Sequence, residues 1–146
     1  MRNVSICALL SLAMTACMAN GGSAAEQASE IRIESGPRLG APRATHQLVA
    51  VGEGRLLAIG GCVRAGCEAG PASATVDIID ARSMELAGSG QLLAERIQPS
   101  VAALPGGRVL VLGGWIDGRV SATTEIFDSA TGKSVAGPAM AAPRNA

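Results

Sequence analysis

The sequence predicts an all-β protein built from two four-stranded antiparallel units. The first observation is an internal repeat in a chain rich in glycine (19 of 146 residues). The second is that each repeat holds short apolar runs separated by glycine-rich turns, with no helical spacing of apolar residues. The aligned pairs are residues 43–61 with 96–114, and 75–80 with 123–128, and an Arg-ending element recurs at 36–43, 89–96 and 137–144.

Each unit contains signals for four strands. The first two apolar runs of a unit flank a turn that contains glycine, which indicates a hairpin. The third run leads into a turn that starts with Asp, and a fourth, outer strand precedes the recurring Arg. The predicted strands are 48–51, 55–59 and 76–79 in the first unit, and 101–104, 108–112 and 124–127 in the second.

A Gly-Gly pair ends the second strand of each unit, at Gly60 and Gly61 and again at Gly113 and Gly114. Without a Cβ atom, these residues allow positive φ angles and the close approach of a neighbouring backbone. We therefore expect the chain to be crowded at this end of the strands.

Four antiparallel strands in about 50 residues are typical of one propeller blade. Together with the Gly-Gly pairs, residues 125–132 and the Gly-Pro-containing junctions, the pattern resembles the kelch family in its bacterial galactose-oxidase-like form. The resemblance implies kelch-type blades at about 44–92 and 97–140, with an extra outer strand at 31–34. The family usually has a Trp in the fourth strand and often a Tyr in the third; here Ser134 and Leu86 stand near the Trp position, and Phe127 and Ile79 at the Tyr position.

The number of units predicts an incomplete, open β-propeller over residues 31–146. A propeller closes with about four to eight blades, and this sequence encodes two plus one strand. Two explanations stay open: a truncated or partial kelch protein, or several chains that assemble into a ring.

The N-terminus is typical of export. Residues 1–16 contain an early Arg and a short apolar run, and small residues precede Cys17, as in the signal peptide and acylated cysteine of bacterial lipoproteins. Residues 17–30 then form a flexible tether. The alternative is an ordinary secretory signal that is cut later, for instance after Ala25. Both predict an exported protein; with lipid on Cys17 it is anchored in the cell envelope, at the outer membrane or in the periplasm of a Gram-negative cell.

The cysteines support the same compartment. Cys62 and Cys67, with four residues between them, are expected to form a disulfide in an oxidising environment. A metal pair or free thiols are the alternatives, although a metal site would need further Cys or His ligands that the chain lacks.

Composition excludes several functions. The net charge is zero, and one Trp, one Phe and no Tyr leave little for a base to stack on, so we expect no nucleic-acid partner. The single histidine, His46, removes any metal site or proton relay that needs two imidazoles, and we read it as an exposed residue. We expect neither a metal nor another cofactor, and no enzymatic activity.

The candidate ligand-binding residues are Arg43, Arg96 and Arg144, which recur at the junctions between units. Their guanidinium groups could clamp carboxylates or sulfated glycans; alternatively, they brace loop carbonyls between the units. The repeat-equivalent acidic residues are expected to be acceptors in turns. These are Asp77, Asp80, Glu125 and Asp128.

The sequence therefore predicts a non-enzymatic binding module for a protein or a glycan. The first alternative is a fragment of a propeller enzyme, oxidase-like or sialidase-like, without its catalytic residues. The chain contains no tyrosine, which argues against the oxidase. Resemblance to that enzyme family would imply tyrosine residues that serve as copper ligand and as radical. The second alternative is an inactive gene remnant.

Overall fold

A computed structural model describes residues 35–64, 67 and 71–146. The predicted signal peptide, Cys17, the tether and the strand at 31–34 lie outside the described residues. The strands are β1 (Gln47–Val51), β2 (Arg55–Ile59), β3 (Ser73–Asp80), β4 (Glu85–Arg96), β5 (Ser100–Leu104), β6 (Arg108–Leu112), β7 (Trp115–Ile116), β8 (Arg119–Val120), β9 (Thr124–Asp128) and β10 (Lys133–Ala136).

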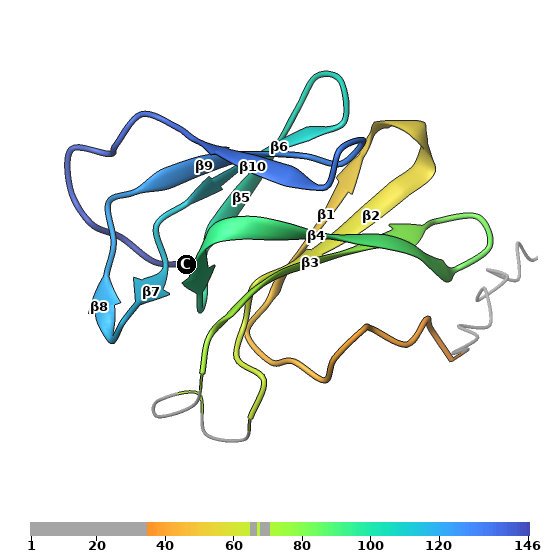
Figure 1. Cartoon of the computed structure of the whole chain (residues 1–146), viewed down its shortest axis with the longest axis horizontal. Coiled ribbons are helices and arrows are strands. Elements are labelled where there is room, and N and C mark those ends of the chain that lie inside the picture. Colours follow the sequence, from red (N-terminus) through yellow and green to blue (C-terminus); the bar gives the residue numbers. More distant parts are fainter. Residues whose placement is uncertain (1–34, 65–66, 68–70) are drawn as a thin grey trace, which may run out of the picture. The chain divides into compact units, whose positions relative to one another are not determined.

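These strands form one eight-stranded mixed sheet and a separate small hairpin (Figure 1), so the all-β prediction is confirmed. The order in the large sheet is β1-β2-β3-β4-β10-β9-β6-β5. Strands β1 to β4 pair antiparallel as a first unit, and β5, β6, β9 and β10 as a second. The two units meet at a parallel pairing between Lys133 of β10 and Gln91 of β4.

The predicted strands agree with the observed ones most closely where the apolar run is continuous. Strands β2 and β6 have the predicted bounds, because glycines stand at both ends of these runs. Strand β3 is longer than predicted, since the polar residues Ser73 and Thr75 extend its pairing with β4.

The hydrophobic core lies between the two units. It joins Leu57, Ile59 and Val76 of the first unit to Val109, Val111 and Phe127 of the second. The edge strands β1 and β5 also contact each other, so the sheet nearly closes upon itself.

The hairpin of β7 and β8 was missed by the strand prediction. Its turn, Asp117-Gly118, has positive φ at both residues (49° and 73°), as a type I′ turn requires. Asp-Gly between short apolar segments is a hairpin signal, so the sequence did contain the information.

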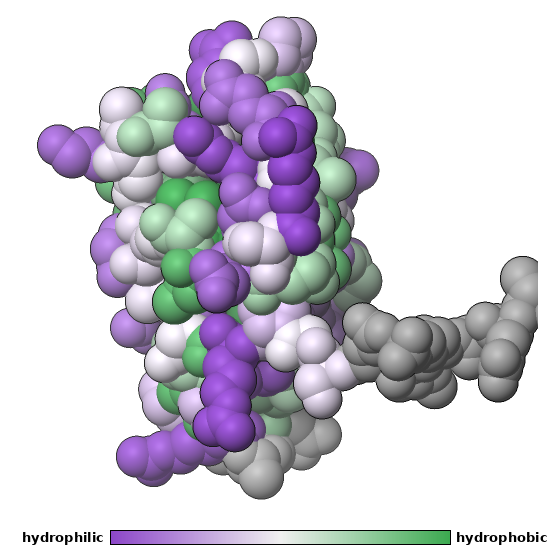
Figure 2. Space-filling view, turned by 90° about the vertical axis from the view of Figure 1, so that its right-hand side faces the viewer, coloured by the Kyte–Doolittle hydropathy of each residue, from purple (hydrophilic) through white to green (hydrophobic). Residues whose placement is uncertain are grey.

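Figure 2 shows the face that carries the turn between β3 and β4, where hydrophilic and apolar side chains alternate. Met84 and Leu86, at this turn and at the start of β4, are each 44% exposed. In the part of the chain that the structure describes, no helix is long and apolar enough to cross a membrane.

Candidate functional site

Arg43 binds the first unit through a buried ion pair with Asp77. The Nη2 atom of Arg43 lies 3.1 Å from Oδ2 of Asp77, and the two side chains are 1% and 4% exposed. The same guanidinium donates to the carbonyl oxygens of Gly60 and Thr75 and to the Thr75 hydroxyl. Asp77 also accepts a hydrogen bond from the backbone N–H of Gly40.

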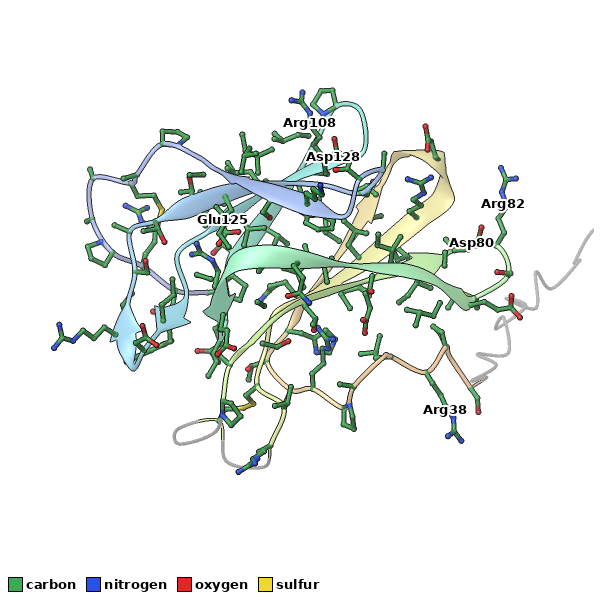
Figure 3. The ribbon with its side chains drawn as sticks, in the orientation of Figure 1. Arg38, Asp80, Arg82, Arg108, Glu125 and Asp128 are labelled. Carbon is green, nitrogen blue, oxygen red and sulfur yellow. A yellow bond between two sulfur atoms is a disulfide. The ribbon has the colours of Figure 1, made fainter. Side chains whose placement is uncertain are left out.

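Arg96 makes the equivalent contacts with the second unit. Its Nη2 atom lies 2.8 Å from Oε1 of Glu125, and the side chains are 1% and 2% exposed. The guanidinium also donates to the carbonyl oxygens of Gly113 and Thr123 and to the Thr123 hydroxyl. Figure 3 shows Glu125 on β9 pointing toward the end of β4, where it accepts from the N–H groups of Leu93 and Ala94.

The two Arg-centred sites are related by the sequence repeat. In each, an Arg at the end of a junction segment binds a strand-ending Gly carbonyl, a Thr and a carboxylate on the next strands. Both guanidinium groups are thus engaged by protein acceptors, which is the bracing role left open above. A ligand could reach Arg43 or Arg96 only by displacing these buried contacts.

Arg144 differs from its two counterparts. Its side chain is exposed, and within the described residues its guanidinium forms neither an ion pair nor a hydrogen bond. Its backbone is nevertheless held as expected for the repeat, because the Gly114 N–H donates to the Arg144 carbonyl at 3.0 Å.

The acidic residues divide into two pairs. Asp80 and Asp128 lie where their strands end and the turns begin (Figure 3). They are turn acceptors, as predicted, because each carboxylate accepts hydrogen bonds from the backbone N–H groups of two following residues. The prediction is wrong for Asp77 and Glu125, which lie inside strands β3 and β9 and bind the arginines. Strand pairing turns these two side chains to the face that receives the guanidinium.

The strand-ending glycines behave as the sequence predicts. All four have positive φ, and Gly61 and Gly114 are the most extreme at 95° and 84°. A Cβ atom at Gly61 would lie 2.5 Å from the carbonyl oxygen of Ala44, and one at Gly114 would lie 2.8 Å from that of Ile97. Any larger residue would force the junction segments away from the sheet.

His46 is partly buried beside the Arg43 site, contrary to the exposed position expected from the sequence. Its Nδ1 atom is buried and has no hydrogen-bond partner among the described residues. Burial, and next the Arg43 charge, lower the pKa of His46 below its usual 6.5, while Asp77 acts in the opposite direction.

The shifted pKa of His46 predicts a loss of stability on mild acidification. The unfolded chain takes up the proton near pH 6.5, before the folded chain does, so stability is complete above that pH and falls as the pH drops below it. We expect the free energy of unfolding in urea to decrease from pH 7 to pH 5, and to decrease less in a His46→Gln variant. Equal decreases in both proteins would contradict the prediction, because His46 is the only histidine.

Cys62 and Cys67 form the predicted disulfide, with their Cα atoms 5.5 Å apart. Cys62 also bridges Ala44 and Ala72 through its backbone, so the disulfide lies where the first junction segment meets the start of β3. The Thr45 hydroxyl lies 3.7 Å from the sulfur of Cys67.

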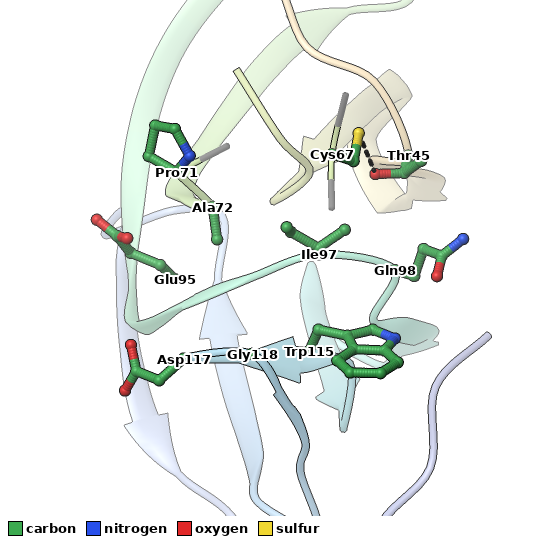
Figure 4. Close-up of a pocket in the computed structure, with 10 residues that line it drawn as sticks. All are labelled: Thr45, Cys67, Pro71, Ala72, Glu95, Ile97, Gln98, Trp115, Asp117 and Gly118. Carbon is green, nitrogen blue, oxygen red and sulfur yellow. Dashed lines mark hydrogen bonds between the residues drawn. The ribbon is translucent and has the colours of Figure 1, made fainter. Parts of the chain in front are cut away.

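A cleft of about 730 Å³ lies next to this disulfide (Figure 4). The side chains of Ile97 and Trp115 line its wall, and Trp115 is 40% exposed. Glu95 and Asp117 contribute carboxylates, both on exposed residues. The other lining residues are Thr45, Cys67, Pro71, Ala72, Gln98 and Gly118.

The chemistry of the cleft is that of a binding surface for neutral or cationic groups. An exposed indole face can stack on a sugar ring or attract a cation, and carboxylates accept hydrogen bonds from hydroxyl or ammonium groups. Among the lining residues that the structure describes, there is no Lys, Arg or His. Anionic ligands would therefore meet the like charges of two carboxylates among these described residues.

The cleft was not found by sequence reasoning. Trp115, Glu95 and Asp117 belong to none of the motifs from which the candidate residues were predicted. The signal that could have found it was the Asp-Gly turn, because that turn closes the hairpin in which Trp115 is the first residue of β7 and pairs with Ile97.

No family model matches the chain, and no curated protein matches it. Among residues 35–64, 67 and 71–146, no group of three His, Cys, Asp or Glu side chains is arranged to hold a metal ion.

Proposed function

We propose that the protein is an exported, non-enzymatic binding module that uses the cleft beside Trp115 to bind a protein or a glycan. The observation that carries the proposal is the combination of an exposed Trp face with two carboxylates in one cleft. Binding sites of this kind are concave and mostly apolar, with a few polar groups that orient the ligand. A neutral glycan or a Lys-bearing peptide segment suits this lining better than the sulfated ligand considered for the arginines.

We also propose that the two units are kelch-type propeller blades in an incomplete, open propeller. In support, each unit is a four-stranded antiparallel meander, and the Gly-Gly pairs and Arg-ending junctions occur at equivalent places in both. The parallel pairing of β10 with β4 is a departure from separate blades.

Export and lipid attachment at Cys17 belong to the same proposal, since the disulfide between Cys62 and Cys67 suits an oxidising compartment. Mass spectrometry of the protein isolated from cell envelopes is expected to find diacylglycerol on an N-terminal Cys17. A free N-terminus after Ala25 would contradict this.

Trp115 offers a direct assay, because it is the only Trp and the chain has no Tyr. Titration with a neutral oligosaccharide, with a lysine-rich peptide and with heparin as anionic control is expected to shift the Trp emission to shorter wavelength for one of the first two probes only. Trp115→Ala, followed by calorimetry, should weaken binding of that probe about tenfold or more, which is about 1.4 kcal/mol.

Variants of the two carboxylates of the cleft distinguish a cationic ligand from a neutral glycan. If the ligand is cationic, Glu95→Gln and Asp117→Asn should each reduce affinity, and increasingly so at low salt; a neutral glycan should be affected much less. Glu85→Gln is the matched control, because Glu85 is an exposed carboxylate at the start of β4 and Glu95 lies near the other end of that strand. No emission shift with any probe would contradict the proposal.

A further inference from the structure

The three Arg-ending segments are here called connectors, and the second and third of them are held alike by their backbones. The connectors are residues 36–43, 89–96 and 137–144. Gly61 N–H donates to the carbonyl oxygen of Arg96 at 2.8 Å, and Gly114 N–H donates to that of Arg144 at 3.0 Å. Arg144 is therefore placed on the second unit as Arg96 is placed on the first.

The side chains of the connectors reach forward to the next unit. The Arg96 backbone lies against the first unit, and its guanidinium binds Gly113, Thr123 and Glu125 of the second. Arg144 stands in the same position relative to the second unit, with an exposed side chain. By the repeat, its acceptors belong to a unit that follows the second one.

The sheet faces follow the same repeat. The face of the first unit that meets the second carries Leu57 and Ile78, and their counterparts Leu110 and Ile126 lie on the outward face of the second unit, where they are half-buried. Val135 pairs with Ile126 on that face and is 61% exposed. An apolar face is thus available beside Arg144.

The first unit carries a face that would fit the outward face of the second unit. The second unit meets the first through Val101, Val111 and Glu125. Their repeat counterparts are Leu48, Ala58 and Asp77, which share one face of the first unit through the pairings of Leu48 with Ala58 and of Ala58 with Asp77. Leu48 is 58% exposed, whereas Ala58 and Asp77 are buried, and Gly40 and Arg43 of the first connector bind Asp77.

We propose that a second copy of this chain docks head-to-tail on the outward face of the second unit, and that Arg144 replaces Arg43 of that copy beside its Asp77. The two connectors concerned are closely similar, since 36–43 and 137–144 share Gly, Pro, Ala, Pro and Arg at equal positions. The exchange conserves one Arg–Asp pair and adds an interface equivalent to the one between the units within the chain. Domain swapping likewise replaces a contact within one chain by the equivalent contact between two copies.

The acceptor site tolerates the exchanged connector. Gly40 N–H donates to Asp77, and the corresponding residue of the last connector is Ala141. A Cβ atom at Gly40 would lie 3.1 Å from Oδ1 of Asp77, so the carboxylate must shift by only a few tenths of an ångström. In the second unit, Leu93 occupies the same position and donates to Glu125. The inference does not depend on the ligand of the cleft.

Sedimentation equilibrium of the full chain tests the proposal. We expect concentration-dependent association of the wild type, reduced about tenfold or more by Arg144→Ala, with thermal stability of the monomer unchanged because Arg144 is exposed. Arg108→Ala, another exposed arginine, is the matched control and should associate like the wild type. A wild type that stays monomeric, or an Arg144→Ala variant that associates equally, would overturn the proposal.

A second experiment examines the acceptor site itself. In an Arg43→Ala variant, Asp77 keeps its hydrogen bond from Gly40 but has lost its guanidinium partner. A synthetic peptide of residues 137–144 that displaces the first connector should therefore raise the melting temperature of this variant, whereas the same peptide with Arg144→Ala should not. Absence of this effect in a folded Arg43→Ala protein would count against the exchange. If that variant does not fold, the comparison of wild type with Arg144→Ala still decides.

Discussion

Replacing Arg96 by alanine is expected to lower the free energy of unfolding by about 3–5 kcal/mol. The substitution leaves Glu125, 2% exposed, as a buried charge without its cation. It also removes donors from the carbonyl oxygens of Gly113 and Thr123, and a buried acceptor without a partner is costly. Urea unfolding followed by circular dichroism measures the loss.

The matched control is Arg108→Ala, because Arg108 is exposed and its side chain binds only the Pro105 carbonyl among the described residues. We expect a change within about 0.5 kcal/mol for this variant. Adding Glu125→Gln to Arg96→Ala should recover part of the stability, since the unpaired charge is then gone. Equal stabilities of the Arg96→Ala and Arg108→Ala variants would show that the ion pair does not hold the units together.

Replacing Phe127 by alanine is the second large expected effect, about 3–5 kcal/mol. Phe127 is fully buried between the two units, and its ring lies over Gly90 of β4. A Cβ atom at Gly90 would come within 2.6 Å of the ring, so position 90 has no room for a side chain. The alanine variant leaves a cavity at the contact between units.

Phe127→Leu keeps most of the volume and should cost about 1.5 kcal/mol or less. Val135→Ala is an exposed control on the neighbouring strand β10, since Val135 is 61% exposed. The same urea experiment compares the three variants. If Phe127→Ala were no more destabilising than Val135→Ala, the core between the units would not contribute as the packing indicates.

The strand positions were largely predictable because their causes are local. A continuous apolar run bounded by glycines defines β2 and β6 in the sequence alone. The positive φ angles of Gly61 and Gly114 were predictable from the Gly-Gly pairs that end these two strands. The disulfide was predictable from two cysteines with a short spacing. The Asp-Gly turn of β7 and β8 was equally local.

The roles of the charged residues were not predictable in the same way. Arg43 and Asp77 are 34 residues apart, and Arg96 and Glu125 are 29 apart. The repeat indicated that the two arginines are equivalent to each other and that the two carboxylates are as well. The same spacing, however, is expected for an arginine that faces a ligand and for one that braces a strand. Which carboxylate accepts the guanidinium depends on the register of β3 and β9, which turns Asp77 and Glu125 inward and leaves Asp80 and Asp128 in the turns.

By itself, the sequence determined the all-β class, the repeat and the positions of its turns, since each depends on residues close together in the chain. Only the tertiary structure decided that Arg43 and Arg96 are buried while Arg144 is exposed, and that Trp115, Glu95 and Asp117 line one cleft. The physical reason is that burial and pairing of these side chains are set by contacts between strands from distant parts of the chain. No local pattern specifies those contacts.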